Sequence, residues 1–123
     1  MRLIFLGGTC IAVAAIAMPA VAHHSHAMFD QDVSVEIEGT VVAFNWTNPH
    51  SWLHIIVQDE NGEAKRWSLE MGVPGALARR GMRPNTFMPG DKLSVVIHPL
   101  KDGAPGGELL AVTLPNGVTI DEL

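Results

Sequence analysis

Residues 73–81 read Val-Pro-Gly-Ala-Leu-Ala-Arg-Arg-Gly, and they are the chain's one helical candidate. Pro74 suits the first helical turn, where its missing N–H group needs no partner, and Gly81 suits the position just past the end. Arg79 and Arg80 fall in the last turn, where positive charge is favourable. The flanking segments have patterns typical of strands. The sequence therefore predicts a single short helix over residues 73–80 within an otherwise β-structured chain.

Three strands are expected before this helix, over residues 33–46, 52–58 and 64–71. In the first, apolar and polar residues alternate, as in a strand with one buried face. Gly39 interrupts that alternation and predicts a β-bulge or bend at its own position. The second strand should turn one aliphatic face to the core: Leu53, Ile55 and Val57.

Two or three strands are expected after the helix. They cover residues 92–98, 108–114 and, beyond the Asn116-Gly117 turn, 118–120. The fourth strand should direct Leu93, Val95 and Ile97 inward. Three strands, one helix and two or three further strands is the order of an OB-fold. The sequence thus predicts a mostly β protein, a small OB-like barrel of five or six strands with a short helix between strands 3 and 4. The rival architecture is a small β-sandwich.

The first 22 residues have the pattern of a secretory signal peptide. Arg2 supplies a positive charge, residues 3–17 are almost wholly apolar, and Ala20-Val21-Ala22 ends the segment with small residues. The alternative is an uncleaved membrane anchor over residues 3–22. Cleavage predicts three parts: a signal peptide (1–22), a His-rich N-terminal segment (23–32) and a β-barrel domain (33–123). The predicted location is the bacterial periplasm, with membrane contact only through the signal peptide during export.

Composition excludes several classes of function. The chain has 8 Lys and Arg residues against 13 Asp and Glu residues, a formal net charge of −5. Such a protein lacks the basic surface that nucleic-acid binding usually needs, and its charge favours cations as ligands. The single cysteine, Cys10, lies in the predicted signal peptide. The mature chain would therefore have no disulfide, no thiolate metal ligand and no cysteine nucleophile.

Three histidines follow directly on the predicted cleavage site: His23, His24 and His26. Cleavage after Ala22 would give His23 a free α-amino group beside its imidazole, and together the two nitrogens could chelate one metal ion. An all-nitrogen ligand set suits Cu(II) first, then Ni(II) or Zn(II). Short His-rich tracts indicate metal binding only by composition, so the alternative is a merely polar tail.

A second candidate site is the segment from Asn45 to His54, which has tryptophans on both sides of a tight loop. Trp52 and His54 should point away from the core, and Trp46 should meet them across the hairpin. The predicted ligand-binding residues are Trp46, Asn48, His50 and Trp52. The alternative is that the rings are buried in packing. If the N-terminal segment lies over this face, the predicted metal ligands are His23, His24, His26, His50 and His54.

The remaining chemistry-bearing residues have simpler interpretations. His98 precedes Pro99 at a strand end and is expected to be structural, and Glu70 is expected to pair with Arg79 or Arg80. The four methionines Met28, Met71, Met82 and Met88 show no clustered spacing, so core filling is favoured over Cu(I) binding. No nucleophile–base pair, phosphate-binding loop or dinucleotide fingerprint can be identified. We therefore expect a protein that is not an enzyme.

Six short motifs occur in a fixed order: AHHS (22–25), FD (29–30), NPHSWLHIIV (48–57), RWSLE (66–70), LARRG (77–81) and PGD (89–91). In this order the chain resembles a family of small exported bacterial proteins of unknown function. His26 and Met82 stand where that family is expected to have aromatic residues. The resemblance implies export and a compact β domain, and it implies no reaction.

The function predicted from these observations is that of an exported periplasmic binding module, with copper bound through the processed N-terminal histidine cluster. The alternative is a metal-free accessory domain that binds a protein or an envelope ligand through the face of Trp46 and Trp52. A third class, an enzyme with a terminal-histidine copper centre, ranks last, because no substrate groove or supporting catalytic residues can be identified.

Overall fold

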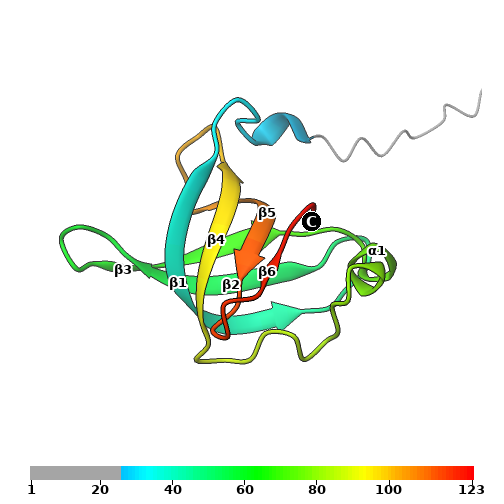
Figure 1. Cartoon of the computed structure of the whole chain (residues 1–123). Helices are drawn as coiled ribbons and strands as arrows, with labels where there is room; N and C mark the ends of the chain where they lie inside the picture. Colours follow the sequence, from blue (N-terminus) through cyan, green and yellow to red (C-terminus); the bar gives the residue numbers. More distant parts are fainter. Residues whose placement is uncertain (1–25) are drawn as a thin grey trace, which may run out of the picture.

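The computed structural model describes residues 26–123. The predicted signal peptide, His23 and His24 lie outside the described residues. The elements are η1 (His26–Met28), β1 (Val35–Asn45), β2 (Trp52–Gln58), β3 (Ala64–Glu70), α1 (Pro74–Arg79), β4 (Lys92–Pro99), β5 (Gly106–Thr113) and β6 (Thr119–Ile120) (Figure 1). The predicted strands and the predicted helix are confirmed, with boundaries shifted by no more than two residues.

The strands form one closed barrel. The sheet order is β3-β2-β1-β4-β5-β6, and an additional parallel pairing between β3 and β5 joins the two sides. The long strand β1 makes this possible, because its first half pairs with β4 and its second half pairs with β2. The result is a five-stranded barrel with β6 added beside β5. The predicted OB-like topology is confirmed, and the β-sandwich alternative is wrong.

The core lies inside the barrel and under α1. The alternation predicted for β2 and β4 is confirmed by five fully or nearly fully buried side chains: Leu53, Ile55, Leu93, Val95 and Ile97. Val57 is only partly buried. From α1 and the loop after it, Leu77, Met82 and Phe87 join the same cluster. The helix therefore covers one end of the barrel, as Figure 1 shows, and it is held there by apolar burial.

The irregularity of β1 lies at Val42 and not at Gly39, so the predicted position of the bulge is wrong. The register of β1 against β2 shifts between Val41 and Ala43. Gly39 has a different role. A Cβ atom at this position would lie 2.7 Å from Ile55 Cδ1 and 3.0 Å from the carbonyl oxygen of Ile56. Glycine therefore permits the close approach of β1 to β2.

The bulge moves Phe44 of β1, and Trp46 just beyond the end of β1, to the core side. The rings of Phe44 and Phe87 meet edge to face with their centroids 4.8 Å apart, and Trp46 lies 5.8 Å from Phe44 in a similar geometry. Trp52 is on the opposite face of β2 from buried Leu53. The predicted shared face of Trp46 and Trp52 is therefore wrong, because one extra residue in β1 reverses the alternation.

The described part of the N-terminal segment packs on the barrel beside the β4–β5 loop. Phe29 is 4% exposed and forms an isolated β-bridge with Leu100. The Asp30 N–H group donates to the carbonyl of Pro99 at 2.8 Å, and the Lys101 N–H group donates to the carbonyl of Met28 at 3.0 Å. One buried ring and two backbone hydrogen bonds thus hold residues 26–30 in place. Within residues 26–123, no helix is long and apolar enough to cross a membrane.

Candidate functional site

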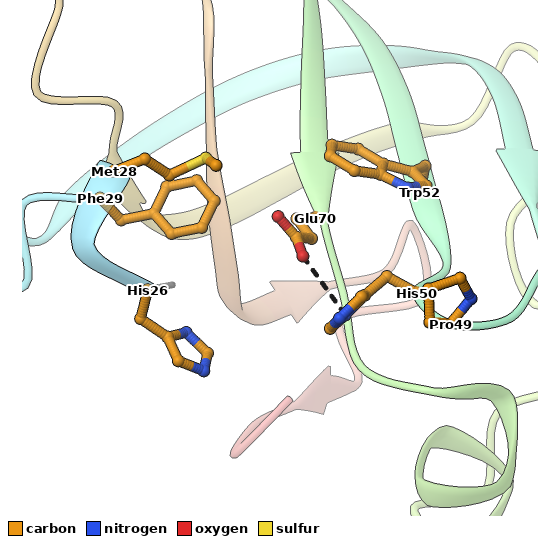
Figure 2. Close-up of a pocket in the computed structure, with 7 residues that line it drawn as sticks. All are labelled: His26, Met28, Phe29, Pro49, His50, Trp52 and Glu70. Atoms are coloured by element: carbon orange, nitrogen blue, oxygen red, sulfur yellow. Dashed lines mark ion pairs between the residues drawn. The ribbon is translucent and has the colours of Figure 1, made fainter. Parts of the chain in front are cut away.

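A pocket of about 280 Å³ lies where the N-terminal segment meets the barrel. Its lining residues are His26, Met28, Phe29, Pro49, His50, Trp52 and Glu70. In Figure 2 the residues of the N-terminal segment lie on one side, His50 and Trp52 lie on the other, and Glu70 lies between them. The pocket therefore has two halves, which come from segments distant in sequence.

The barrel half of the pocket is held by the loop between β1 and β2. Ser51 is completely buried, and its backbone N–H and C=O groups bond to Gly72 and Met71 respectively, at 3.1 and 2.9 Å. The Thr47 hydroxyl donates to the carbonyl of His50 at 2.8 Å. These bonds fix the backbone on both sides of the His50 side chain. The pocket face of the loop is therefore built before any ligand is bound.

Two glutamates are backbone partners where the barrel closes. Glu70 ends β3, and its partner across the parallel pairing with β5 is Glu108. Each carboxylate has its own histidine: His50 Nδ1 lies 3.3 Å from Glu70 Oε1, and His26 Nδ1 lies 2.6 Å from Glu108 Oε1. We call the parallel pairing of β3 with β5 the β3–β5 seam. The two imidazoles are thus positioned by neighbouring residues of this seam, although the histidines come from different segments.

These contacts define which ring nitrogen could bind a ligand. His50 Nδ1 also lies 3.0 Å from the carbonyl of Met71, so this nitrogen carries the proton and donates it. In a neutral imidazole the lone pair is then on Nε2. His26 has the same arrangement toward Glu108. Histidines that bind metals usually donate the other ring N–H group to a carboxylate or a carbonyl in this way. Both pocket histidines therefore have the orienting contacts of metal ligands.

His54 is positioned differently and does not line the pocket. Its Nδ1 lies 2.9 Å from the Ser68 hydroxyl, and its Nε2 lies 3.2 Å from Asn45 Nδ2. Burial, and secondarily the positive charge of Arg66, lowers the pKa of His54 from the usual value of 6.5. Both ring nitrogens already have side-chain partners. The contact with Ser68 also brings a hydroxyl next to an imidazole, which sequence reasoning missed because the two residues are on different strands.

The structure brings together only some of the predicted site residues. Of the predicted metal ligands, His26 and His50 share the pocket, and His23 and His24 lie outside the described residues. Of the predicted ligand-binding residues, His50 and Trp52 line the pocket, whereas Trp46 and Asn48 do not. Within residues 26–123, no group of three or more His, Cys, Asp or Glu side chains is arranged to hold a metal ion.

The structure corrects several of the residue roles that were predicted from the sequence, both in the pocket and outside it. The core-filling role predicted for the methionines is confirmed for Met71 and Met82, and it is wrong for Met28 and Met88, which are each 53% exposed. Glu70 contacts His50 in place of the predicted arginines, and Arg80 pairs with Glu122 at 2.6 Å. The FD motif (29–30) was the sequence signal for the N-terminal half of the pocket, because an aromatic ring next to the histidines can anchor the segment to the barrel by burial.

Fold and site together define a small OB-type β-barrel with a ligand-sized pocket on its outer face, completed by the segment that precedes the barrel. Residues 11–109 match the model of a family of unknown function, DUF6152. The chain belongs to this family, which confirms the predicted membership in a family of unknown function. No curated protein and no solved structure matches the chain.

Proposed function

We propose that this protein is an exported periplasmic binding module and that copper is its ligand, held jointly by the processed N-terminus and the barrel. One observation carries the proposal. His26 and His50 line the same pocket, and each has its Nδ1 against one of two adjacent carboxylates. Such contacts orient imidazoles for metal binding, and the carboxylates add negative charge that attracts a cation.

The remaining ligands would come from the residues just before His26. An extended chain advances about 3.3–3.6 Å per residue, so His23 can lie roughly 10 Å from His26. We propose that, after cleavage at Ala22, the α-amino group and the imidazole of His23 bind the metal together with His50. An amine with several imidazoles is a ligand set that favours Cu(II) over other divalent metals of the first transition row.

The test is a Cu(II) titration of protein that begins at His23, with affinity measured by competition against a chelator of known strength. The comparison is the same chain with one extra methionine before His23, which moves the amine out of the chelate. We expect the extension and His50→Ala each to weaken binding by about tenfold or more. His54→Gln is the matched control and should leave the affinity unchanged, because His54 lies outside the pocket. Equal affinity in all four proteins would refute the proposal.

Processing is tested separately by N-terminal sequencing of the exported protein. The proposal expects the sequence to begin at His23. A start at Val21 would place His23 third in the chain, and this would replace the expected chelate by one made of the amine, backbone amides and His23. A start at Met1 in protein extracted from the membrane would refute export with cleavage.

A metal-free binding function has one observation in its favour, the apolar wall of the pocket. Met28, Phe29, Pro49 and Trp52 line it, and such surfaces bind small apolar or aromatic molecules. This site replaces the predicted face of Trp46 and Trp52. A metal-free function predicts no saturable Cu(II) binding by the processed protein, so the same titration separates the two functions.

A further inference from the structure

The pocket between the N-terminal segment and the barrel combines an apolar wall with a carboxylate. Met28, Phe29, Pro49 and Trp52 form the wall, and Glu70 lies among them. The Glu70 side chain is only 17% exposed. A carboxylate in largely apolar surroundings is costly to keep unless polar partners offset its lost hydration. The partners of Glu70 therefore determine which kind of ligand the pocket favours.

The two oxygens of the Glu70 carboxylate have different surroundings. Oε1 lies 3.3 Å from His50 Nδ1. In Figure 2 this oxygen is directed at His50, and the other is turned toward the side of the pocket on which Phe29 lies. Within residues 26–123 the second oxygen has no hydrogen-bond or ion-pair partner. A donor group on a ligand in the pocket would satisfy it.

The charged groups around the pocket favour a cation over an anion. Among the described residues that line the pocket, none is Lys or Arg. Each of the two pocket histidines lies against a glutamate: His50 against Glu70, and His26 against Glu108. Protonation of both rings would neutralise the two carboxylates and add nothing further. An anionic ligand would therefore meet no net positive charge from these four groups in any protonation state, whereas a cation is attracted whenever a ring is neutral.

Trp52 places an aromatic ring beside this carboxylate. Trp52 on β2 and Glu70 on β3 are direct partners in the antiparallel pairing. The side chains of such partners leave the same face of the sheet, with their Cβ atoms about 4.5–5.5 Å apart. A cation bound at Glu70 can therefore also contact the indole, whose face attracts positive charge. The remaining wall, from Met28, Phe29 and Pro49, is suited to an uncharged apolar part of the same ligand.

We propose that the pocket binds a small organic cation, a primary amine attached to an apolar or aromatic body. The ammonium group donates to the second oxygen of Glu70, and the body packs between Phe29 and Trp52. The volume of about 280 Å³ suits a small molecule. The inference starts from the apolar wall that favours a metal-free function and adds the charge of the ligand. It does not require copper, because neither Glu70 nor Trp52 is one of the proposed metal ligands.

The test uses three probes that share a phenylethyl body and differ in the charge at one end: phenethylamine, phenethyl alcohol and hydrocinnamate. Each is titrated at neutral pH into chelator-treated protein that begins at His23, and binding is followed by the NMR chemical shifts of backbone amides. We expect the amine to bind about tenfold or more tightly than the alcohol, because hydrogen bonds between charged groups are stronger than neutral ones. Hydrocinnamate should bind most weakly. The shift changes should centre on residues 26–29, 49–52 and 70.

Two variants locate the charge and the aromatic contact. Glu70→Gln keeps the size of the side chain and removes its charge, so it should weaken amine binding by about tenfold and leave alcohol binding within about twofold. Glu60→Gln is the matched control, because Glu60 is exposed and does not line the pocket, and it should change neither affinity. Trp52→Leu should weaken the amine and the alcohol alike, by about fivefold or more.

Equal affinities of the amine and the alcohol would refute the inference and leave the metal-free function standing without selectivity for charge. The inference is also refuted if none of the three probes binds saturably, or if Glu70→Gln binds the amine as tightly as the unchanged protein. The Cu(II) titration is a separate measurement on protein without these probes. Failure of copper binding therefore leaves the inference intact, and failure of amine binding leaves the copper proposal intact.

Discussion

Replacing Phe29 with alanine should release the N-terminal segment from the barrel without unfolding the barrel. Phe29 is the one buried residue between His26 and Val33, and it is 4% exposed. The pocket depends on it, because His26 and Met28 precede it directly. Loss of this anchor should therefore remove half of the pocket and leave the closed β-sheet intact.

The expected magnitude follows from what holds residues 26–30 in place. Burying a phenylalanine removes roughly 200 Å² of surface from water, which contributes about 5 kcal/mol. Two backbone hydrogen bonds to the barrel add about 1 kcal/mol each. Ordering five residues costs roughly 7–8 kcal/mol at about 1.5 kcal/mol each. The opposing contributions cancel to within about 1–2 kcal/mol, so docking adds no more than that to the free energy of unfolding. Phe29→Ala should therefore lower the free energy of unfolding by at most about 1–2 kcal/mol, because the segment detaches first.

The assay combines urea denaturation with hydrogen exchange. Phe87→Ala is the control, since Phe87 is 2% exposed within the barrel core, and it should cost about 3–5 kcal/mol. Phe29→Ala should also accelerate exchange of the Lys101 amide, whose acceptor is the Met28 carbonyl. A loss of stability equal to that of Phe87→Ala, or unchanged protection of Lys101, would show that the segment is not a separately docked unit.

Two further predictions concern the barrel itself. His54 should titrate below pH 6.5 in the folded protein, mainly because burial disfavours its charged form. The folded protein accommodates the neutral ring better than the charged ring, so the contribution of neutral His54 to the free energy of unfolding is complete above pH 6.5. This contribution is lost as the pH falls through the folded pKa. NMR titration checks this, and a midpoint at or above 6.5 contradicts it. Gly39→Ala should cost about 1–3 kcal/mol in urea denaturation, because the new Cβ overlaps Ile55. Gly72→Ala, whose Cβ would meet only an ordinary contact at 3.8 Å, should cost less, and equal losses would remove the steric explanation.

The fold could be predicted because its determinants are local. Alternation identified β2 and β4, and the Pro74 and Gly81 signals bounded the helix to within two residues. The bulge was misplaced because two different structural features place glycine in a strand, an irregular register or a close approach of another backbone. The sequence contains no signal that separates them. Only the packing of β1 against Ile55 shows that Gly39 is the second case.

The site was predicted less well because it depends on contacts across the barrel. The N-terminal segment was expected to approach both His50 and His54; the structure brings His26 to the same pocket as His50, whereas His54 does not line that pocket. Trp46 was misassigned because one extra residue in β1 reverses its face. The pairing of Glu70 with Glu108 exists only when β3 and β5 meet. No spacing in the sequence indicates that parallel contact.

The β3–β5 seam has a consequence for how a ligand would leave. His50 and Glu70 are on one side of the seam, and His26, through Glu108, is on the other. Local opening of a folded protein breaks its least protected contacts without global unfolding. Separation of β3 from β5 would keep every other strand pairing and still pull the two halves of the pocket apart. A ligand that contacts both halves binds only the closed form, so it suppresses these openings. The residence time of the ligand then depends on how often β3 and β5 separate.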